Sequence, residues 1–379
     1  MDKKFINQIE PWYGKEEKKA VLDYLNSGGG LMEFKKTKEF EKMICQYTGA
    51  KYCSVLPNGT VSLFLALLAL GIKKGDEVIV PDFTMIATPN AVQMAGAKPV
   101  LVDIDEDSLC LNPDLVEKAI TTKTKAVFHV SINGRAGRLA ELKKLCRKKK
   151  ISLLEDAAQA LGSFYANKHL GRHGLLGSFS FSVPKIVTTG QGGALVTDNK
   201  KMYEKVEKLK DFGRVRAGVD WHDQMGWNFK FTDLQAVLGT TQMKKLPKRA
   251  GLKKEIYKLY QQYLKEVKEV QFIQTNLKEV SPWFIDVLVP DPLALQNYLK
   301  EKNVGARIFY PAIHTQPVYR HIKGSFPVAT KIAQHGLWLP SSAFLKKADI
   351  QYICNCIKKF YQANQPYTYS KIPERGVEG

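Results

Sequence analysis

The chain has 379 residues, of which 44% are hydrophobic and 25% charged, so it can bury a large core and has an ordinary globular composition. Its formal net charge of +20 would suit nucleic acid, a membrane surface or an anionic small substrate. No aromatic-plus-basic signature, helix-turn-helix spacing or membrane-length apolar run accompanies that charge, so solvated helix faces explain it best and no nucleic acid or membrane partner is expected.

The first residues, Met1-Asp2-Lys3-Lys4, lack the apolar segment of a signal peptide. The six cysteines show no paired metal-ligand spacing, so we expect reduced thiols, a cytoplasmic protein and no metal site. Helices are predicted over residues 15–26 and 37–48, followed by a strand over 52–56.

An apolar helix over residues 61–70 follows the tetrapeptide Pro57-Asn58-Gly59-Thr60. A Gly-Thr pair at a helix start offers free backbone N–H groups, the positive end of the helix dipole and a hydroxyl, which together suit a phosphate. The alternative is a simple N-cap supplied by Asn58 or Thr60, and the segment taken alone favours this alternative.

Strands alternate with helices through the first half of the chain. The predicted strands cover residues 98–102, 125–130 and 151–156, and an earlier one follows a turn within residues 75–81. This alternation predicts an α/β fold with right-handed crossovers and a largely parallel central sheet. Ligands of such sheets bind beyond the carboxyl ends of the strands. Five residues fall at such ends: Gly59, Thr60, Asp156, Gln159 and Lys185.

The alternating Ser/Phe run over residues 177–183 predicts a short strand with one hydroxyl-bearing face. Pro184 forces a turn, which places Lys185 on a bend before the flexible segment 190–193. An amine there becomes a nucleophile if burial or a neighbouring cation lowers its pKa, and pyridoxal 5'-phosphate (PLP) enzymes need one such amine. Asp156 could keep the pyridine nitrogen protonated. The alternative for Lys185 is a solvated surface lysine, and the alternative for Asp156 is an ordinary strand-to-helix cap.

The second half predicts a helix over residues 232–246, an interruption at Pro247 and a long helix to about residue 268. Shorter elements follow, including 283–289, 292–302 and a last helix over 347–361. We therefore expect a large PLP-binding domain over residues 13–246. A smaller α+β domain is expected from residues 1–12 and 247–364, followed by a flexible tail over 365–379.

From about Pro11 to Tyr361 the sequence resembles the PLP-dependent sugar aminotransferases of the DegT/DnrJ/EryC1/StrS family, which have the fold type I (aspartate aminotransferase-like) architecture. The resemblance rests on ordered motifs, which are Asn58-Gly59-Thr60, Gly75-Asp76-Glu77-Val78, Glu155-Asp156-Ala157-Ala158-Gln159, Ser180 five residues before Lys185, Thr189-Gly190-Gln191-Gly192-Gly193, Gly226-Trp227-Asn228 and His314. It implies PLP as cofactor, with pyridoxamine 5'-phosphate as its intermediate form.

The resemblance also implies roles for individual residues. Lys185 would hold PLP and later move the proton, Asp156 would bind the pyridine nitrogen, and Gln159 would lie beside the ring and its 3-hydroxyl. Three further residues, Gly59, Thr60 and Ser180, would form the phosphate site. Met85 occupies the position that stacks on the ring and is often aromatic in the family.

Asn228 matches an asparagine that reaches the phosphate from the neighbouring subunit, so the resemblance implies a homodimer with shared sites. Two departures from the family pattern, Lys230 and Gln191, have no assigned effect. One family branch carries histidine in place of the PLP lysine and is a dehydratase, and Lys185 argues against it.

Three segments, residues 58–60, 82–88 and 184–193, most resemble the branch that moves an amino group from L-glutamate to C4 of GDP-4-keto-6-deoxy-D-mannose. Tyr310 and His314 are candidates for contacting the sugar, the alternative being a structural Tyr–His pair. Two other functions remain open: an aminotransferase for a UDP- or dTDP-linked ketosugar, at C3 or C4, and a non-catalytic basic binding protein that retains the fold.

Overall fold

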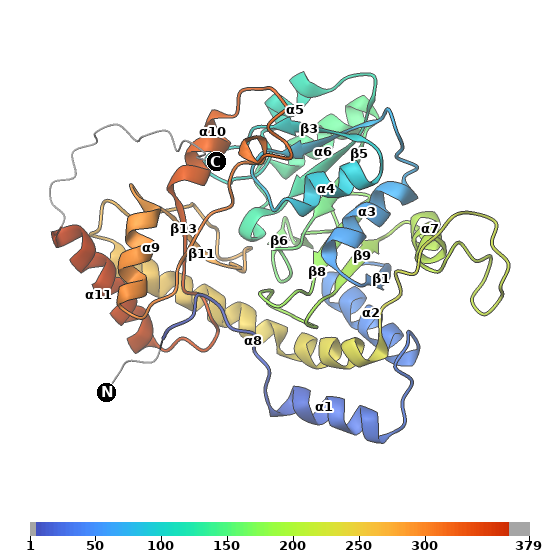
Figure 1. Cartoon of the computed structure of the whole chain (residues 1–379), viewed down its shortest axis with the longest axis horizontal. Coiled ribbons are helices and arrows are strands. Elements are labelled where there is room, and N and C mark those ends of the chain that lie inside the picture. Colours follow the sequence, from blue (N-terminus) through green and yellow to red (C-terminus); the bar gives the residue numbers. More distant parts are fainter. Residues whose placement is uncertain (1–4, 364–379) are drawn as a thin grey trace.

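The computed structural model describes residues 5–363, which form two larger sheets with flanking helices and one two-stranded sheet (Figure 1). The larger sheet has seven strands in the order β1-β9-β8-β5-β4-β2-β3. Their bounds are β1 Tyr52–Leu56, β2 Glu77–Pro81, β3 Lys98–Val102, β4 Thr124–Val130, β5 Ser152–Asp156, β8 Leu176–Ser180 and β9 Gly193–Thr197. In this sheet only β9 is antiparallel to the other strands, which confirms the predicted, largely parallel arrangement.

Helices connect these strands and cover the sheet. They are α1 Lys15–Asn26, α2 Lys35–Thr48, α3 Gly59–Ala69, α4 Ala87–Met94, α5 Pro113–Ala119, α6 Leu139–Lys149 and α7 Lys200–Lys210. The helix α3 is almost wholly apolar because it contacts the sheet through β8 and β9 while α4 and α7 cover it. A short hairpin, β6 Phe164–Tyr165 and β7 Lys168–His169, and a 3-10 turn, Ile132–Gly134, complete this part.

The smaller sheet is antiparallel, with the order β10-β11-β13-β12. Its elements are β10 Gln271–Phe272, β11 Ile285–Leu288, α9 Pro292–Glu301, β12 Arg307–Ile308, a 3-10 turn Ile313–Thr315, α10 Pro327–His335, β13 Gly336–Leu339 and α11 Lys347–Ala363. Ile6 near the N-terminus bridges Val304 beside this sheet. The predicted tail over 365–379 lies outside the described residues.

The helix α8, Asp233–Leu264, is continuous, so the predicted interruption at Pro247 is wrong. A proline in a helix interior removes one hydrogen bond and costs about 3 kcal/mol. The flanking Leu246 and Ala250 are buried, and α8 packs against α1, α2 and α11, so burial outweighs that cost. Figure 1 shows α8 running from the smaller sheet to α2. Within residues 5–363 no helix, α8 included, has the length and apolar character needed to cross a bilayer.

Candidate active site

Lys185 lies in a turn that follows the end of β8. The Lys185 N–H donates to the Ser182 carbonyl at 3.0 Å, and the Thr189 N–H closes the wider loop by donating to Phe181 at 2.9 Å. The Lys185 amine lies 3.5 Å from the centre of the Trp283 ring and has no hydrogen-bond partner within residues 5–363. Burial lowers the pKa of this amine to about 7, although the negative charge of Asp156 acts in the opposite direction.

Asp156 ends β5, the strand that pairs in parallel with β8. Its carboxylate is buried and accepts hydrogen bonds from the Thr88 hydroxyl at 2.8 Å and from the Ala158 N–H at 3.1 Å. Burial raises the pKa of Asp156, and these hydrogen bonds and the charge of Lys185 oppose the rise. An acid and an amine thus interact at the carboxyl ends of two neighbouring strands.

The start of α3 faces Ser180. The Asn58 side chain caps the helix by accepting from the Val61 N–H at 2.9 Å, and within residues 5–363 the N–H groups of Gly59 and Thr60 find no acceptor. A Cβ at Gly59 would lie 3.1 Å from the Ser180 Cβ, so glycine permits this close approach. Asn58 is thus the N-cap, and two free N–H groups and the nearby hydroxyls remain as donors that fit a phosphate.

Gln159 shares a small cavity with Ser180 and Lys185. The cavity is lined by Ala158, Gln159, Leu161, Ser180, Lys185, Ile186, Ser281 and Trp283. The Gln159 Oε1 accepts from the Asn133 N–H at 2.8 Å, which fixes the amide. Three of the residues predicted to bind the ring and its phosphate, Gln159, Ser180 and Lys185, therefore line one cavity.

Met85 belongs to the turn that carries Thr88. Its carbonyl accepts from the Thr88 N–H at 3.2 Å, while its thioether is exposed and accepts from the Ala87 N–H at 3.0 Å. Met85 is thus tied to the residue that holds Asp156. Within the described chain no ring contact is recorded for its side chain.

Tyr310 and His314 come from the segment that follows β12 and do not form the Tyr–His pair considered from sequence. The His314 Nδ1 lies 2.6 Å from the Asp82 carboxylate, and the ring stacks on Phe326 with centroids 4.9 Å apart. Tyr310 packs edge-on against Trp338 at 4.7 Å. Burial raises the pKa of Tyr310 to about 12, and the negative charge of Asp156 adds to that rise.

Asn228 is exposed and does not line the cavity that holds Lys185. Its neighbours Trp227 and Phe229 stack on each other, with centroids 6.0 Å apart, and both rings pack edge-on against Phe64 of α3. The preceding segment projects away from the sheet after α7 (Figure 1). Within one subunit, Asn228 therefore does not share the cavity of Gln159, Ser180 and Lys185.

Three residues that shape the site were not predicted from the sequence: Thr88, Asn133 and Trp283. The Asn133 side chain bonds both the N–H and the carbonyl of Phe284, at 2.7 and 2.9 Å, with its own backbone in the left-handed region at φ 51°. The Asn133-Gly134 pair after a strand was the one available signal, because such pairs favour left-handed turns.

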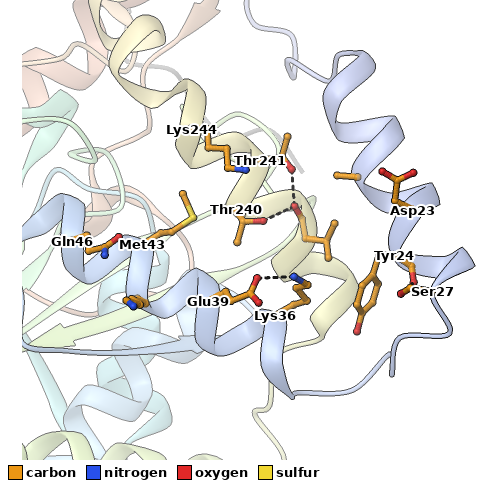
Figure 2. Close-up of a pocket in the computed structure, with 13 residues that line it drawn as sticks. Asp23, Tyr24, Ser27, Lys36, Glu39, Met43, Gln46, Thr240, Thr241 and Lys244 are labelled. Atoms are coloured by element: carbon orange, nitrogen blue, oxygen red, sulfur yellow. Dashed lines mark hydrogen bonds and ion pairs between the residues drawn. The ribbon is translucent and has the colours of Figure 1, made fainter.

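A second, open hollow of about 640 Å³ lies between α1, α2 and α8 (Figure 2). Its charged side chains include Lys36 and Glu39, which pair with each other at 2.7 Å. The hydroxyls of Thr240 and Thr241 both donate to the Val237 carbonyl. Lys185 and Asp156 do not line this hollow, so we place the candidate active site at the sheet edge.

A mostly parallel seven-stranded sheet joined to a smaller α+β part, with a lysine and an acid at adjacent strand ends, is the architecture of fold type I PLP-dependent aminotransferases. The chain is one of these enzymes. It belongs to the DegT/DnrJ/EryC1/StrS aminotransferase family, whose profile matches residues 11–358. The family was predicted from sequence, and this match confirms it.

Two curated relatives span almost the whole chain. Each is a GDP-perosamine synthase, one from Escherichia coli O157:H7 and one from Vibrio cholerae, and each is 33% identical over 94% of this chain and 99% of its own length. Among solved structures, the aminotransferase TlmJ from Streptoalloteichus hindustanus is 28% identical with a TM-score of 0.90, covering 94% of this chain and 99% of that chain.

Proposed function

We propose that this enzyme transfers an amino group from L-glutamate to C4 of GDP-4-keto-6-deoxy-D-mannose and so forms GDP-perosamine. The observation that carries the proposal is the 33% identity to two GDP-perosamine synthases over 99% of their length. The segments 58–60, 82–88 and 184–193 also support it, because they most resemble the branch of the family that acts on this substrate.

In this proposal Lys185 holds the cofactor covalently and, once released, moves the proton between cofactor and substrate carbons as a general acid and base. When bound, PLP withdraws electrons from the reacting carbon and carries the amino group between the two half-reactions. Asp156 keeps the ring nitrogen protonated. The hydrogen bond from Thr88 orients the Asp156 carboxylate toward that task.

The positions of the hydrogen-bond donors and the ring-side residues suggest the remaining contacts with the cofactor and the sugar. The N–H groups of Gly59 and Thr60, with the Ser180 hydroxyl, would bind the cofactor phosphate at the start of α3. Gln159 and Met85 would flank the ring. Tyr310 and His314 would contact the sugar, with His314 held in place by Asp82.

The substrate assignment is tested by assaying L-glutamate with a panel of nucleotide 4-ketosugars. We expect the highest kcat/KM with GDP-4-keto-6-deoxymannose, with mass spectrometry showing the added amine and NMR placing it at C4. A 3-ketosugar in the same panel tests the position of the amine. A higher kcat/KM with a UDP- or dTDP-linked ketosugar would refute the GDP-perosamine assignment and leave the aminotransferase activity intact.

The functional unit proposed here is a homodimer in which Asn228 reaches the partner's cofactor phosphate. Its own subunit keeps Asn228 exposed, and the projecting segment before it carries Trp221 and Met225 with exposed fractions of 69% and 76%. Large exposed apolar patches mark surfaces that another chain covers, and in the proposed dimer these two side chains would contribute to one.

Mixing two variants that are each expected to retain PLP weakly, Lys185→Ala and Asn228→Ala, tests this shared site. A dimer of one Lys185→Ala subunit and one Asn228→Ala subunit contains one site in which both residues are intact. After subunit exchange, half of the dimers are mixed, so we expect up to about a quarter of the wild-type activity. Each variant incubated alone is the control. If verified exchange restored no activity, the two residues would not belong to one shared site.

A further inference from the structure

Two buried basic residues of α8, Arg249 and Lys253, contact the backbone of Ile186 and Trp283, and burial lowers the pKa of Lys253 to about 7. They lie four residues apart and therefore on one face of the helix. The Arg249 Nη1 donates to the Ile186 carbonyl at 2.9 Å, and the Lys253 Nζ donates to the Trp283 carbonyl at 2.9 Å. Each residue is 3% exposed. The helix thus binds two segments: the one that carries Lys185, through Ile186, and the one that carries Trp283.

Lys253 has no ion-pair partner among residues 5–363. Its amine donates instead to the carbonyl of Trp283 and to the carbonyl and hydroxyl of Ser341, the hydroxyl at 3.2 Å. A buried lysine without a carboxylate is costly, and an apolar side chain would avoid that cost. What Lys253 contributes is a set of hydrogen bonds between the chain before β11 and the chain after β13.

Trp283 connects these bonds to Lys185. The Trp283 indole N–H donates to the Pro184 carbonyl at 2.8 Å, and the ring faces the Lys185 amine at 3.5 Å. Phe284 stacks on the indole, with ring centroids 3.8 Å apart. The Trp283 backbone is therefore held by Lys253 while its side chain holds both the turn and the amine.

We propose that Lys253 is a positioning residue for Lys185: by fixing Trp283, it keeps the Lys185 amine in place whenever that amine is not bound to the cofactor. The inference rests on the proposed role of Lys185. A free lysine side chain has many rotamers, and fixing it costs up to about 2 kcal/mol of entropy. An aromatic face beside the amine favours the required rotamer and also contacts its apolar stem.

The test compares two measurements on cofactor-free protein. One is the rate at which PLP becomes attached to Lys185, followed by the absorbance of the bound cofactor. The other is the dissociation constant of pyridoxamine 5'-phosphate, which cannot form that bond. In Lys253→Met we expect attachment to slow by about tenfold or more, since a small misplacement of a reacting group can cost about 10²-fold. Pyridoxamine phosphate affinity should change by less than about twofold.

Lys258→Met is the matched control, because it makes the same chemical change at an exposed position of α8. Trp283→Phe retains a ring and loses the bond to Pro184, so it keeps the proposal testable if Lys253→Met does not fold; slower attachment is expected there too. Wild-type attachment rates in a folded Lys253→Met or Trp283→Phe protein would overturn the proposal. Equal losses in the attachment rate and in the affinity for pyridoxamine phosphate would also overturn the proposal. Attachment of PLP to another lysine in the wild type would instead refute the proposed role of Lys185.

Discussion

Replacing Lys185 with alanine is expected to abolish covalent attachment of PLP while leaving non-covalent binding of pyridoxamine phosphate. Turnover should fall by at least about 10²–10⁴-fold, the usual contribution of a positioned acid–base group. The physical reason is that the Lys185 amine lies in the cavity with Ser180 and Gln159, where the charge of the Asp156 carboxylate acts on it. Borohydride reduction of the wild-type protein, followed by peptide mapping, should place the cofactor on Lys185.

The pH dependence of attachment gives this experiment a second readout. Attachment requires the neutral amine, and burial lowers the pKa of Lys185 to about 7 from 10.5. The amine is protonated below that pKa and neutral above it, so the attachment rate should rise with pH and level off above about 7. The exposed Lys258→Ala variant should behave as wild type. A label on a lysine other than Lys185 would contradict the assignment.

Replacing Asp156 with asparagine should lower turnover by several orders of magnitude with a modest loss of cofactor affinity. Asparagine keeps the shape of the side chain, and its amide oxygen can still accept from the Ala158 N–H, while its amide nitrogen would donate to the Thr88 hydroxyl in place of the second carboxylate oxygen. It lacks the negative charge that would stabilise a protonated ring nitrogen. Steady-state kinetics and cofactor titration of the folded variant measure the two effects separately.

Asp291→Asn is the matched control for that experiment. The Asp291 side chain caps α9 by accepting from the N–H groups of Leu293 and Ala294, a task that asparagine performs about equally well. Its replacement should leave turnover unchanged. If Asp156→Asn behaved like this control while loaded with PLP, Asp156 would serve as a cap alone.

The part of the site on the large sheet could be predicted because its residues follow strands that sequence patterns detect. Asp156 ends β5, Gly59 and Thr60 follow β1, and Lys185 follows β8. Parallel strands place their carboxyl ends at one edge, so local patterns suffice to gather these residues. The helix start was predicted two residues late because Asn58, rather than Thr60, supplies the cap.

Trp283 could not be predicted in the same way. It lies 98 residues after Lys185 in an apolar stretch whose pattern is that of an ordinary core strand. Its contact depends on how the smaller sheet docks on the larger one, which no local periodicity records. The predicted break at Pro247 was wrong for a related reason. The low intrinsic helix propensity of proline predicts a break there, and the long-range packing of α8 overrides that propensity.

The continuity of α8 fixes the rotational phase between its two ends. Asp233, at its first turn, accepts hydrogen bonds from the N–H groups of Phe34 and Thr37, and Lys253 binds Trp283 twenty residues later. One inserted or deleted residue between them would turn one end by about 100° relative to the other and shift it by about 1.5 Å. The hydrogen bonds of Asp233 and the hydrogen bond of Lys253 to Trp283 could then not form at the same time. The spacing between Asp233 and Lys253 is therefore constrained more strictly than the identity of the exposed side chains along the helix.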